Sequence, residues 1–197
     1  MNASLSRLRV RTVLFGIGYL FRHPQKFIPR LMLRLHQFRD PDYPSIAPGA
    51  VDFIDAELSR GTAIVGEWGS GRSTLWLAKR CATLVSVEHD PEWQRLISSI
   101  LKERGCSHAS VILAEEKSSV YPSAIFSTGV TSFDLFLIDG RLRGECAAVA
   151  IKAIKKGGIV VLDDSNRSEY SDFIKILGKE IHKFTGHARQ TSIFRIE

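Results

Sequence analysis

Residues 67–73 read EWGSGRS, a glycine-rich turn between an apolar strand candidate at 62–65 and a helix candidate at 73–80. Glycine lets the backbone turn tightly and approach a ligand, but many plain strand-to-helix turns also contain it, so the loop alone is a weak signal. Glu88 strengthens this signal, because Glu88 ends a second strand candidate 17 residues after Gly71. In nucleotide-binding folds an acid at about this distance accepts hydrogen bonds from ribose hydroxyls. The loop and the acid together predict a nucleotide site.

Strand and helix signals alternate along the chain from residue 47 onward. The helix candidates lie at 48–58, 73–80, 91–104, 145–154 and 171–181. The strand candidates lie at 62–65, 83–87, 110–113, 133–138, 159–162 and 191–196. This alternation, with nearly continuous apolar strands, predicts a parallel sheet covered by helices on both faces. Such sheets bind ligands at the carboxyl ends of their strands, where the glycine loop and Glu88 are expected.

The positive charge is concentrated at the beginning of the chain. The whole protein has a net charge of +6, whereas residues 1–40 carry eight basic residues and one acid, a net +7. Residues 12–21 form an uncharged run that is too short to span a bilayer, and no small-residue cleavage site follows it, which argues against secretion. We therefore separate a basic amphipathic helical extension at 1–45 from a domain at 46–197.

The extension has the character of a surface that meets a partner. A helix candidate at 27–38 groups apolar residues on one face with arginines beside them. These apolar residues are Phe27, Leu31, Leu35 and Phe38. We expect contact with an anionic membrane surface or, as an alternative, a lid over the site; the apolar content is high for an arm that binds nucleic acid. Three scattered cysteines indicate neither a disulfide framework nor a zinc site, which fits a cytoplasmic protein. The basic segment at residues 1–40 adds the expectation of membrane association.

The charge of the glycine loop helps to choose the cofactor. A dinucleotide fold uses this loop for a pyrophosphate, aided by the helix N-terminus. Here Glu67 lies two residues before Gly69. A carboxylate at that position repels phosphate and suits a cationic ligand. S-adenosylmethionine carries an ammonium and a sulfonium, so the sequence favours it over NAD.

These motifs resemble those of class I S-adenosylmethionine-dependent methyltransferases. EWGSGRS is similar to their motif I, Glu88 to their ribose-binding acid, the sequence DGR at 139–141 to their strand-four motif, and KKGG at 155–158 to the turn before strand five. The resemblance covers roughly residues 47–197, and several segments look like a group of small, mostly uncharacterised enzymes. It implies a three-layer Rossmann-like fold with seven strands in the order 3-2-1-4-5-7-6, strand seven antiparallel. The domain at 46–197 would then be the methyltransferase domain.

The candidate cofactor-binding residues surround the predicted strand ends. By resemblance, Gly69 and Gly71 flank the methionine part of the cofactor, and Glu115 or Glu116 lies near the adenine. Asp90 is expected instead to cap the helix that begins at Pro91. The full candidate set is Glu67, Gly69, Ser70, Gly71, Ser73, Glu88, His89, Glu115 and Asp139.

Three carboxylates at strand ends, Asp139, Asp163 and Asp164, admit two hypotheses. In the first they bind a divalent cation such as Mg²⁺, which prefers oxygen ligands and would lower the pKa of a bound hydroxyl. This layout resembles catechol-type O-methyltransferases, which have an Asp-Asn pair after strand five where this chain has Asp-Asp. In the second, Asp139 orients the substrate or acts as base, and Asp163 or Asp164 caps a turn. The candidate catalytic residues are Asp139, Asp164 and Arg141.

The chemical class of the methyl acceptor is inferred mainly by elimination. No NPPY-like or DPPY-like tetrapeptide follows the strand at 133–138, and no Pro-Cys pair occurs there, which disfavours amino-group and cytosine C5 methylation. Oxygen methylation of a small molecule or glycan remains; the alternatives are an RNA methyltransferase that uses the basic arm, or a non-catalytic nucleotide-binding module. Arg141, Arg143 and Arg167 either clamp an anionic acceptor or pair with the nearby aspartates.

Overall fold

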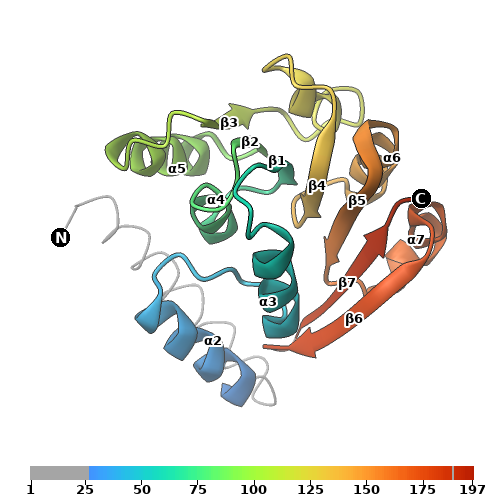
Figure 1. Cartoon of the computed structure of the whole chain (residues 1–197), viewed down its shortest axis with the longest axis horizontal. Helices are drawn as coiled ribbons and strands as arrows, with labels where there is room; N and C mark the ends of the chain where they lie inside the picture. The colour runs from blue at the N-terminus through green and yellow to red at the C-terminus, as the bar shows by residue number, and fades with distance from the viewer. Residues whose placement is uncertain (1–26, 188) are drawn as a thin grey trace.

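The computed structural model describes residues 27–187 and 189–197 and contains a seven-stranded sheet in the order β3-β2-β1-β4-β5-β7-β6 (Figure 1). Strands β1 to β5 run parallel, and β7 runs antiparallel to both of its neighbours. The predicted fold class and strand order are therefore confirmed. The strands are β1 (Ile64–Trp68), β2 (Thr83–Glu88), β3 (Ala109–Leu113), β4 (Phe133–Ile138), β5 (Ile154–Asp163), β6 (Glu180–Gly186) and β7 (Arg189–Arg195).

Helices cover the sheet on both faces. Figure 1 shows α3, α4 and α5 on one side of the sheet and α6 and α7 on the other. The α-helices are α2 (Phe27–Arg39), α3 (Pro48–Glu57), α4 (Arg72–Leu77), α5 (Pro91–Glu103), α6 (Arg143–Ala153) and α7 (Ser171–Ile174). Three short 3₁₀ segments are η2 (Ser123–Phe126), η3 (Ser168–Tyr170) and η4 (Lys175–Leu177).

Alternation along the strands divides the core into two layers. In β4, Leu135 and Leu137 pack with α3, α4 and α5, whereas Phe136 and Ile138 pack with α6 and η2. Burying each such side chain contributes about 1.5–3 kcal/mol, so a strand buried on both faces must be apolar throughout. Asp134 is the exception in β4, and its carboxylate accepts the Ile64 N–H at 2.8 Å and pairs with Lys155 at 2.8 Å.

The end of the first strand differs from the expectation in a way that matters for the site. The sequence predicted a strand at 62–65 with Glu67 at its tip, but β1 continues through Trp68. Glu67 therefore lies inside the sheet, opposite Ser86 of β2 in the parallel register. The loop proper begins at Gly69, after the strand has ended.

The predicted helix at 171–181 is wrong beyond Leu177. Helix α7 has only four residues, η4 follows it, and Gly178 adopts φ 81 before the chain enters β6. Strand β6 is an edge strand with an alternating exposed and half-buried pattern, so it lacks the continuous apolar run that marks the central strands. Its pairing partner β7 follows it directly in the chain, and this antiparallel contact, which sequence periodicity does not report, fixes its conformation.

The segment between α2 and α3 makes polar contacts with the chain around α4 and α5. Asp42, which is 2% exposed, pairs with Lys79 at 2.7 Å and accepts two hydrogen bonds from Arg104. Arg72 donates to the carbonyl of Pro41. These contacts fix the segment between α2 and α3 beside the first turn of α4.

Helix α2 itself is largely uncovered on its apolar side. Leu31, Leu35 and Phe38 lie on the predicted face and are 47%, 48% and 85% exposed. No helix in the described part of the chain is long and apolar enough to cross a membrane. The apolar run at 12–21 lies outside the described residues.

Candidate active site

The loop after β1 approaches the loop after β4 so closely that neither has space for a side chain. A Cβ atom on Gly69 would lie 2.7 Å from the Cα of Gly140, and Gly69 has φ +94, which favours glycine. A Cβ on Gly140 would lie 2.4 Å from the hydroxyl of Tyr121. Because the Asp139 N–H donates to the carbonyl of Trp68 at 3.0 Å, the ends of the two strands are held together.

Glu67 supports the loop from below. Both of its carboxylate oxygens accept hydrogen bonds from hydroxyls: Ser73 at 2.6 Å, Thr74 at 2.5 Å and Ser86 at 2.7 Å. Thr74 in turn accepts the N–H of Gly71 at 2.8 Å. Complete burial raises the pKa of Glu67 to about 7, against the opposing effect of the three hydroxyls. Direct contact of Glu67 with a cationic ligand is therefore not supported by its position; its contacts stabilise the loop.

Glu88 connects the loop to the start of α5. One oxygen accepts the backbone N–H and the hydroxyl of Ser70 at 3.0 and 2.9 Å, and the other accepts the N–H groups of His89 and Asp90 at 2.8 and 2.9 Å. Asp90 also caps α5, as predicted, by accepting the N–H groups of Glu92 and Trp93. Glu88 is thus held rigidly at the carboxyl end of β2.

A cavity of about 730 Å³ opens above these strand ends, a size typical of small-molecule sites. Its lining brings together most of the predicted site residues from three separate stretches of the chain. It is lined by Ser45, Gly69, Ser70, Gly71, Arg72, Ser73, Glu88, His89, Asp90, Trp93, Asp139, Gly140, Arg141, Arg143 and Arg167. A Cβ on Gly71 would meet nothing closer than 4.0 Å, so the space beside this glycine is open to a ligand.

Four predicted site residues are not among the lining residues: Glu67, Glu115, Asp163 and Asp164. Glu115 projects from the loop after β3 and pairs with Lys117, which lowers the pKa of Glu115 through their hydrogen bond. Its neighbour Glu116 lies 3.6 Å from the Arg141 side chain and so comes nearer to the cavity. The expected role of Glu115 beside the adenine stays a prediction.

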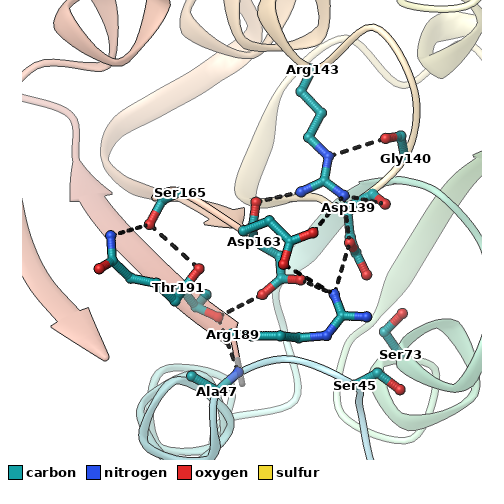
Figure 2. A network of polar contacts seen from close by, with 12 residues as sticks. Ser45, Ala47, Ser73, Asp139, Gly140, Arg143, Asp163, Ser165, Arg189 and Thr191 are labelled. Atoms are coloured by element: carbon teal, nitrogen blue, oxygen red, sulfur yellow. Dashed lines mark hydrogen bonds and ion pairs between the residues drawn. The ribbon is translucent and has the colours of Figure 1, made fainter. Parts of the chain in front are cut away.

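Arg143 and Arg189 lie beside Asp139 and Asp163 at the ends of β4 and β5 (Figure 2), and both also form ion pairs with Asp164. Arg143 donates to the Asp139 carboxylate at 2.9 Å and to backbone carbonyls of both Gly140 and Asp163. Arg189 pairs with Asp163, which also accepts the Thr191 hydroxyl at 2.7 Å. The acids are therefore neutralised by guanidinium groups from two different parts of the chain.

This arrangement does not support the metal-site hypothesis for Asp139, Asp163 and Asp164. Within residues 27–187 and 189–197, no group of three or more histidine, cysteine or acidic side chains is placed to hold a metal ion. Asp163 is fully buried and pairs with Arg189. Asp164, whose backbone φ is 52, pairs with Arg167. With its carboxylate committed to Arg167 and outside the cavity lining, Asp164 is not supported as a catalytic residue by its position.

Asp139 is the aspartate of this group that faces the cavity. Burial raises the pKa of its carboxyl, while Arg189 and Arg143 oppose that change. Burial likewise raises the pKa of Asp163 to about 7, with Asp139 as the next cause. Asp139 combines access to the cavity with a fixed orientation, as a proton acceptor requires.

The family pattern described as "Methyltransferase domain" matches residues 67–165, from Glu67 at the end of β1 to just beyond β5. The chain belongs to this methyltransferase family. Together with the seven-stranded fold, this makes it an S-adenosylmethionine-dependent methyltransferase. No curated protein matches the sequence of this methyltransferase.

Solved structures share the fold of this methyltransferase at low sequence identity. A methyltransferase-like protein from Silicibacter pomeroyi has 21% identity and a TM-score of 0.60, covering 79% of this chain and 89% of the other. A caffeoyl-CoA O-methyltransferase-like protein from Staphylococcus aureus has 12% identity and a TM-score of 0.59, with 92% and 99% covered. An RNA methyltransferase from Salinibacter ruber, in complex with S-adenosyl-L-homocysteine, has 16% identity and a TM-score of 0.53, with 78% and 94% covered.

Sequence patterns did not identify every residue around the methyltransferase site. Arg189 comes from the antiparallel strand β7, far from any motif, and carries no local signal. Ser45 reaches the cavity because the segment before α3 folds back over it. Trp93 also lines the cavity, and its indole N–H donates to the Ser70 carbonyl at 2.7 Å.

Proposed function

We propose that this methyltransferase binds S-adenosylmethionine between the glycine loop and Glu88 and methylates an oxygen of a small molecule or glycan. The observation that carries the proposal is the position of Asp139, which faces the same cavity as Gly69, Gly71 and Glu88. A cofactor bound along the loop would bring its methyl group toward the carboxyl end of β4. An acceptor hydroxyl placed beside Asp139 would then meet that methyl group.

The cofactor side suits a ligand with both positive charge and ribose hydroxyls. Glu88, Asp90 and Asp139 all line the cavity. The methionine part of the cofactor carries positive charge, which these carboxylates favour. Trp93 and Glu88 hold Ser70 from two sides, through its carbonyl and through its N–H and hydroxyl. The loop is therefore preorganised, which reduces the entropy that binding must overcome.

The reaction requires one proton acceptor. The acceptor oxygen forms a bond to the methyl carbon as the sulfur–methyl bond breaks, and the hydroxyl proton passes to Asp139. Positioning of the two reactants contributes most of the acceleration, and a positioned base contributes a further 10²–10⁴-fold as an order of magnitude. Burial raises the pKa of Asp139, which makes its carboxylate a stronger base than that of a solvated aspartate.

The mouth of the cavity suits an acceptor that carries a carboxylate or phosphate. Arg141 and Arg167 line the cavity, and their side chains are 56% and 48% exposed. Both are paired at present, Arg141 with Glu116 and Arg167 with Asp164. The Arg141–Glu116 pair is exposed on both sides and such pairs are weak, so an anionic acceptor could exchange with the Glu116 carboxylate.

For α2 we propose contact with an anionic membrane surface. The helix contains no acidic residue, and its arginines flank an exposed apolar face. Ile28 and Phe38 mark the two ends of that face and are 70% and 85% exposed. Such a combination suits the boundary between lipid headgroups and acyl chains.

Calorimetric titration with S-adenosylhomocysteine tests the cofactor assignment. We expect the parent to bind, and Glu88→Gln to bind at least about tenfold more weakly because a charged hydrogen-bonding group is lost. Glu92→Gln, which removes an exposed acid at the start of the same helix, is the matched control and should bind as the parent does. Equal affinity in Glu88→Gln and the parent would refute the assignment.

Radiolabelled methyl transfer tests the acceptor class. The protein is incubated with labelled S-adenosylmethionine and with hydroxyl-bearing small molecules, glycans and RNA in separate reactions. We expect label on oxygen in the first two groups, and a kcat lower by about 10²-fold or more for Asp139→Asn. Label in RNA alone would establish the RNA alternative instead, and cofactor binding without transfer to any acceptor would favour a non-catalytic role.

A further inference from the structure

Arg189 lies at the centre of the three aspartates. Its Nη1 atom pairs with Asp163 and lies 3.5 Å from an oxygen of Asp164 and 3.9 Å from an oxygen of Asp139. Figure 2 shows its guanidinium between Asp163 and Asp139, with Arg143 approaching from the opposite side. A single positive group thus serves carboxylates from the ends of both β4 and β5.

Three carboxylates this close would repel one another strongly without a cation. Asp163 is fully buried, and the side chains of Asp139 and Asp164 are only 23% and 17% exposed, so water screens them poorly. Clustered carboxylate oxygens at such a site are the ligands that Mg²⁺ and Mn²⁺ prefer. The cluster therefore needs positive charge, and a metal ion or a guanidinium can supply it.

The fold holds Arg189 in that place. Asp163 and Thr191 are directly paired between β5 and β7, so the chain direction of β7 brings Arg189 to the end of β5. The Thr191 hydroxyl donates to Asp163 and accepts the N–H of Ala47 at 3.0 Å, which ties this end of β7 to α3. The side chain is 28% exposed, and Arg189 is the first residue of β7.

We propose that Arg189 is the built-in counter-ion that lies near all three aspartates, occupying the place that a divalent cation would otherwise take. The orientation of Asp139 itself is held more directly by Arg143, which donates to its carboxylate at 2.9 Å. Arg189 also explains why the acids of this chain do not fit the metal-site hypothesis: their oxygens already contact a fixed cation.

Removing the guanidinium should convert the cluster into a metal site. In Arg189→Met, which keeps a long side chain without charge, we expect one Mn²⁺ per chain, detected by electron paramagnetic resonance, with affinity at least about tenfold above that of the parent. Arg189→Lys restores one positive charge and should bind no more Mn²⁺ than the parent. Arg195→Met is the matched control: it removes an arginine from the same strand, paired with Glu57 at 2.6 Å, and should leave Mn²⁺ binding unchanged.

The melting temperature of Arg189→Met gives a second readout, which is informative even when the variant is less stable than the parent. We expect Arg189→Met to melt below the parent and to be restored by Mn²⁺ or Mg²⁺ more than by NaCl of equal ionic strength. The milder Arg189→Gln should show the same pattern, which covers the case in which the methionine variant fails to fold. Each measurement is independent of S-adenosylhomocysteine binding and of turnover, so the inference is tested separately from the proposed function.

Two results would overturn the inference. One is a parent protein that binds one Mn²⁺ per chain and loses it in Asp163→Asn, since the arginine would then not replace the metal. The other is folded Arg189→Met or Arg189→Gln that gains neither Mn²⁺ binding nor specific restoration by divalent ions.

Discussion

At the scale of single residues, the two loop glycines have different reasons to be glycine. A side chain on Gly69 would collide with the backbone of Gly140 and would be strained at φ +94. A side chain on Gly71 would enter open space in the cavity. The packing of the protein requires glycine at residue 69 but not at residue 71, a difference that a sequence pattern alone does not reveal.

Alanine substitutions should separate the two positions. We expect Gly69→Ala to lower the free energy of unfolding by about 1–3 kcal/mol, because it combines backbone strain with overpacking. Gly71→Ala should melt within a few degrees of the parent but weaken S-adenosylhomocysteine binding, since its methyl group takes space from the ligand. Thermal melts and calorimetry on both variants check this; a stable Gly69→Ala, or unaltered binding by Gly71→Ala, would contradict it.

Glu67 should make stability depend on pH. Its pKa is raised from 4.5 to about 7 in the folded protein, so between these values the folded chain holds a proton that the unfolded chain releases. Stability from this group is therefore full below about pH 4.5 and decreases as pH rises toward 7, by up to about 3 kcal/mol.

A neutral side chain at this position should remove that part of the pH dependence. Melting curves from pH 5 to 8 should fall less steeply for Glu67→Gln than for the parent, because the buried amide does not titrate. Glu115→Gln, at an exposed acid, should keep the slope of the parent. Parallel curves for Glu67→Gln and the parent would show that Glu67 is already ionised throughout this range.

At the scale of elements, the sequence predicted what apolar runs and local chemistry determine. The parallel strands and the cap of α5 by Asp90 follow from burial on both faces and from a local hydrogen bond, and these predictions are confirmed. The seven-strand order implied by the family resemblance includes β6, but its residues could not be located from their own pattern, because an edge strand is half in water and depends on its partner β7. The predicted strand ended at Val65, three residues before the observed end of β1 at Trp68. Glu67 was therefore expected at the ligand site but lies in the sheet interior.

In the candidate site, too, residues with local signals could be predicted, whereas residues placed by long-range pairing could not. Glu88, Gly69 and Asp139 could be placed because each follows a strand that is recognisable by itself. Arg189 could not, since its role depends on the antiparallel position of β7 beside β5. The metal-site hypothesis is not supported for this reason: strand ends predict which acids meet, but not which cation reaches them from elsewhere in the fold.

At the scale of the whole molecule, α2 and the cavity are linked through one short segment. Helix α2 ends at Arg39, and Ser45, six residues later, lines the cavity. Asp42 fixes the intervening chain to Lys79 and Arg104. A membrane that contacts the apolar face of α2 would therefore lie against a part of the molecule that is joined rigidly to the edge of the site.

Vesicle sedimentation tests this orientation. We expect the parent to sediment with vesicles that contain phosphatidylserine, and the double variant Leu31→Gln, Phe38→Gln to partition about tenfold less because two exposed apolar side chains are lost. Ile176→Gln changes a residue that is 49% exposed on another element and should sediment like the parent. Higher salt should weaken binding of the parent, since the arginines of α2 supply the electrostatic part. Equal sedimentation of parent and double variant would exclude this face as the membrane contact, and salt-sensitive binding to RNA in place of vesicles would direct attention to the RNA alternative.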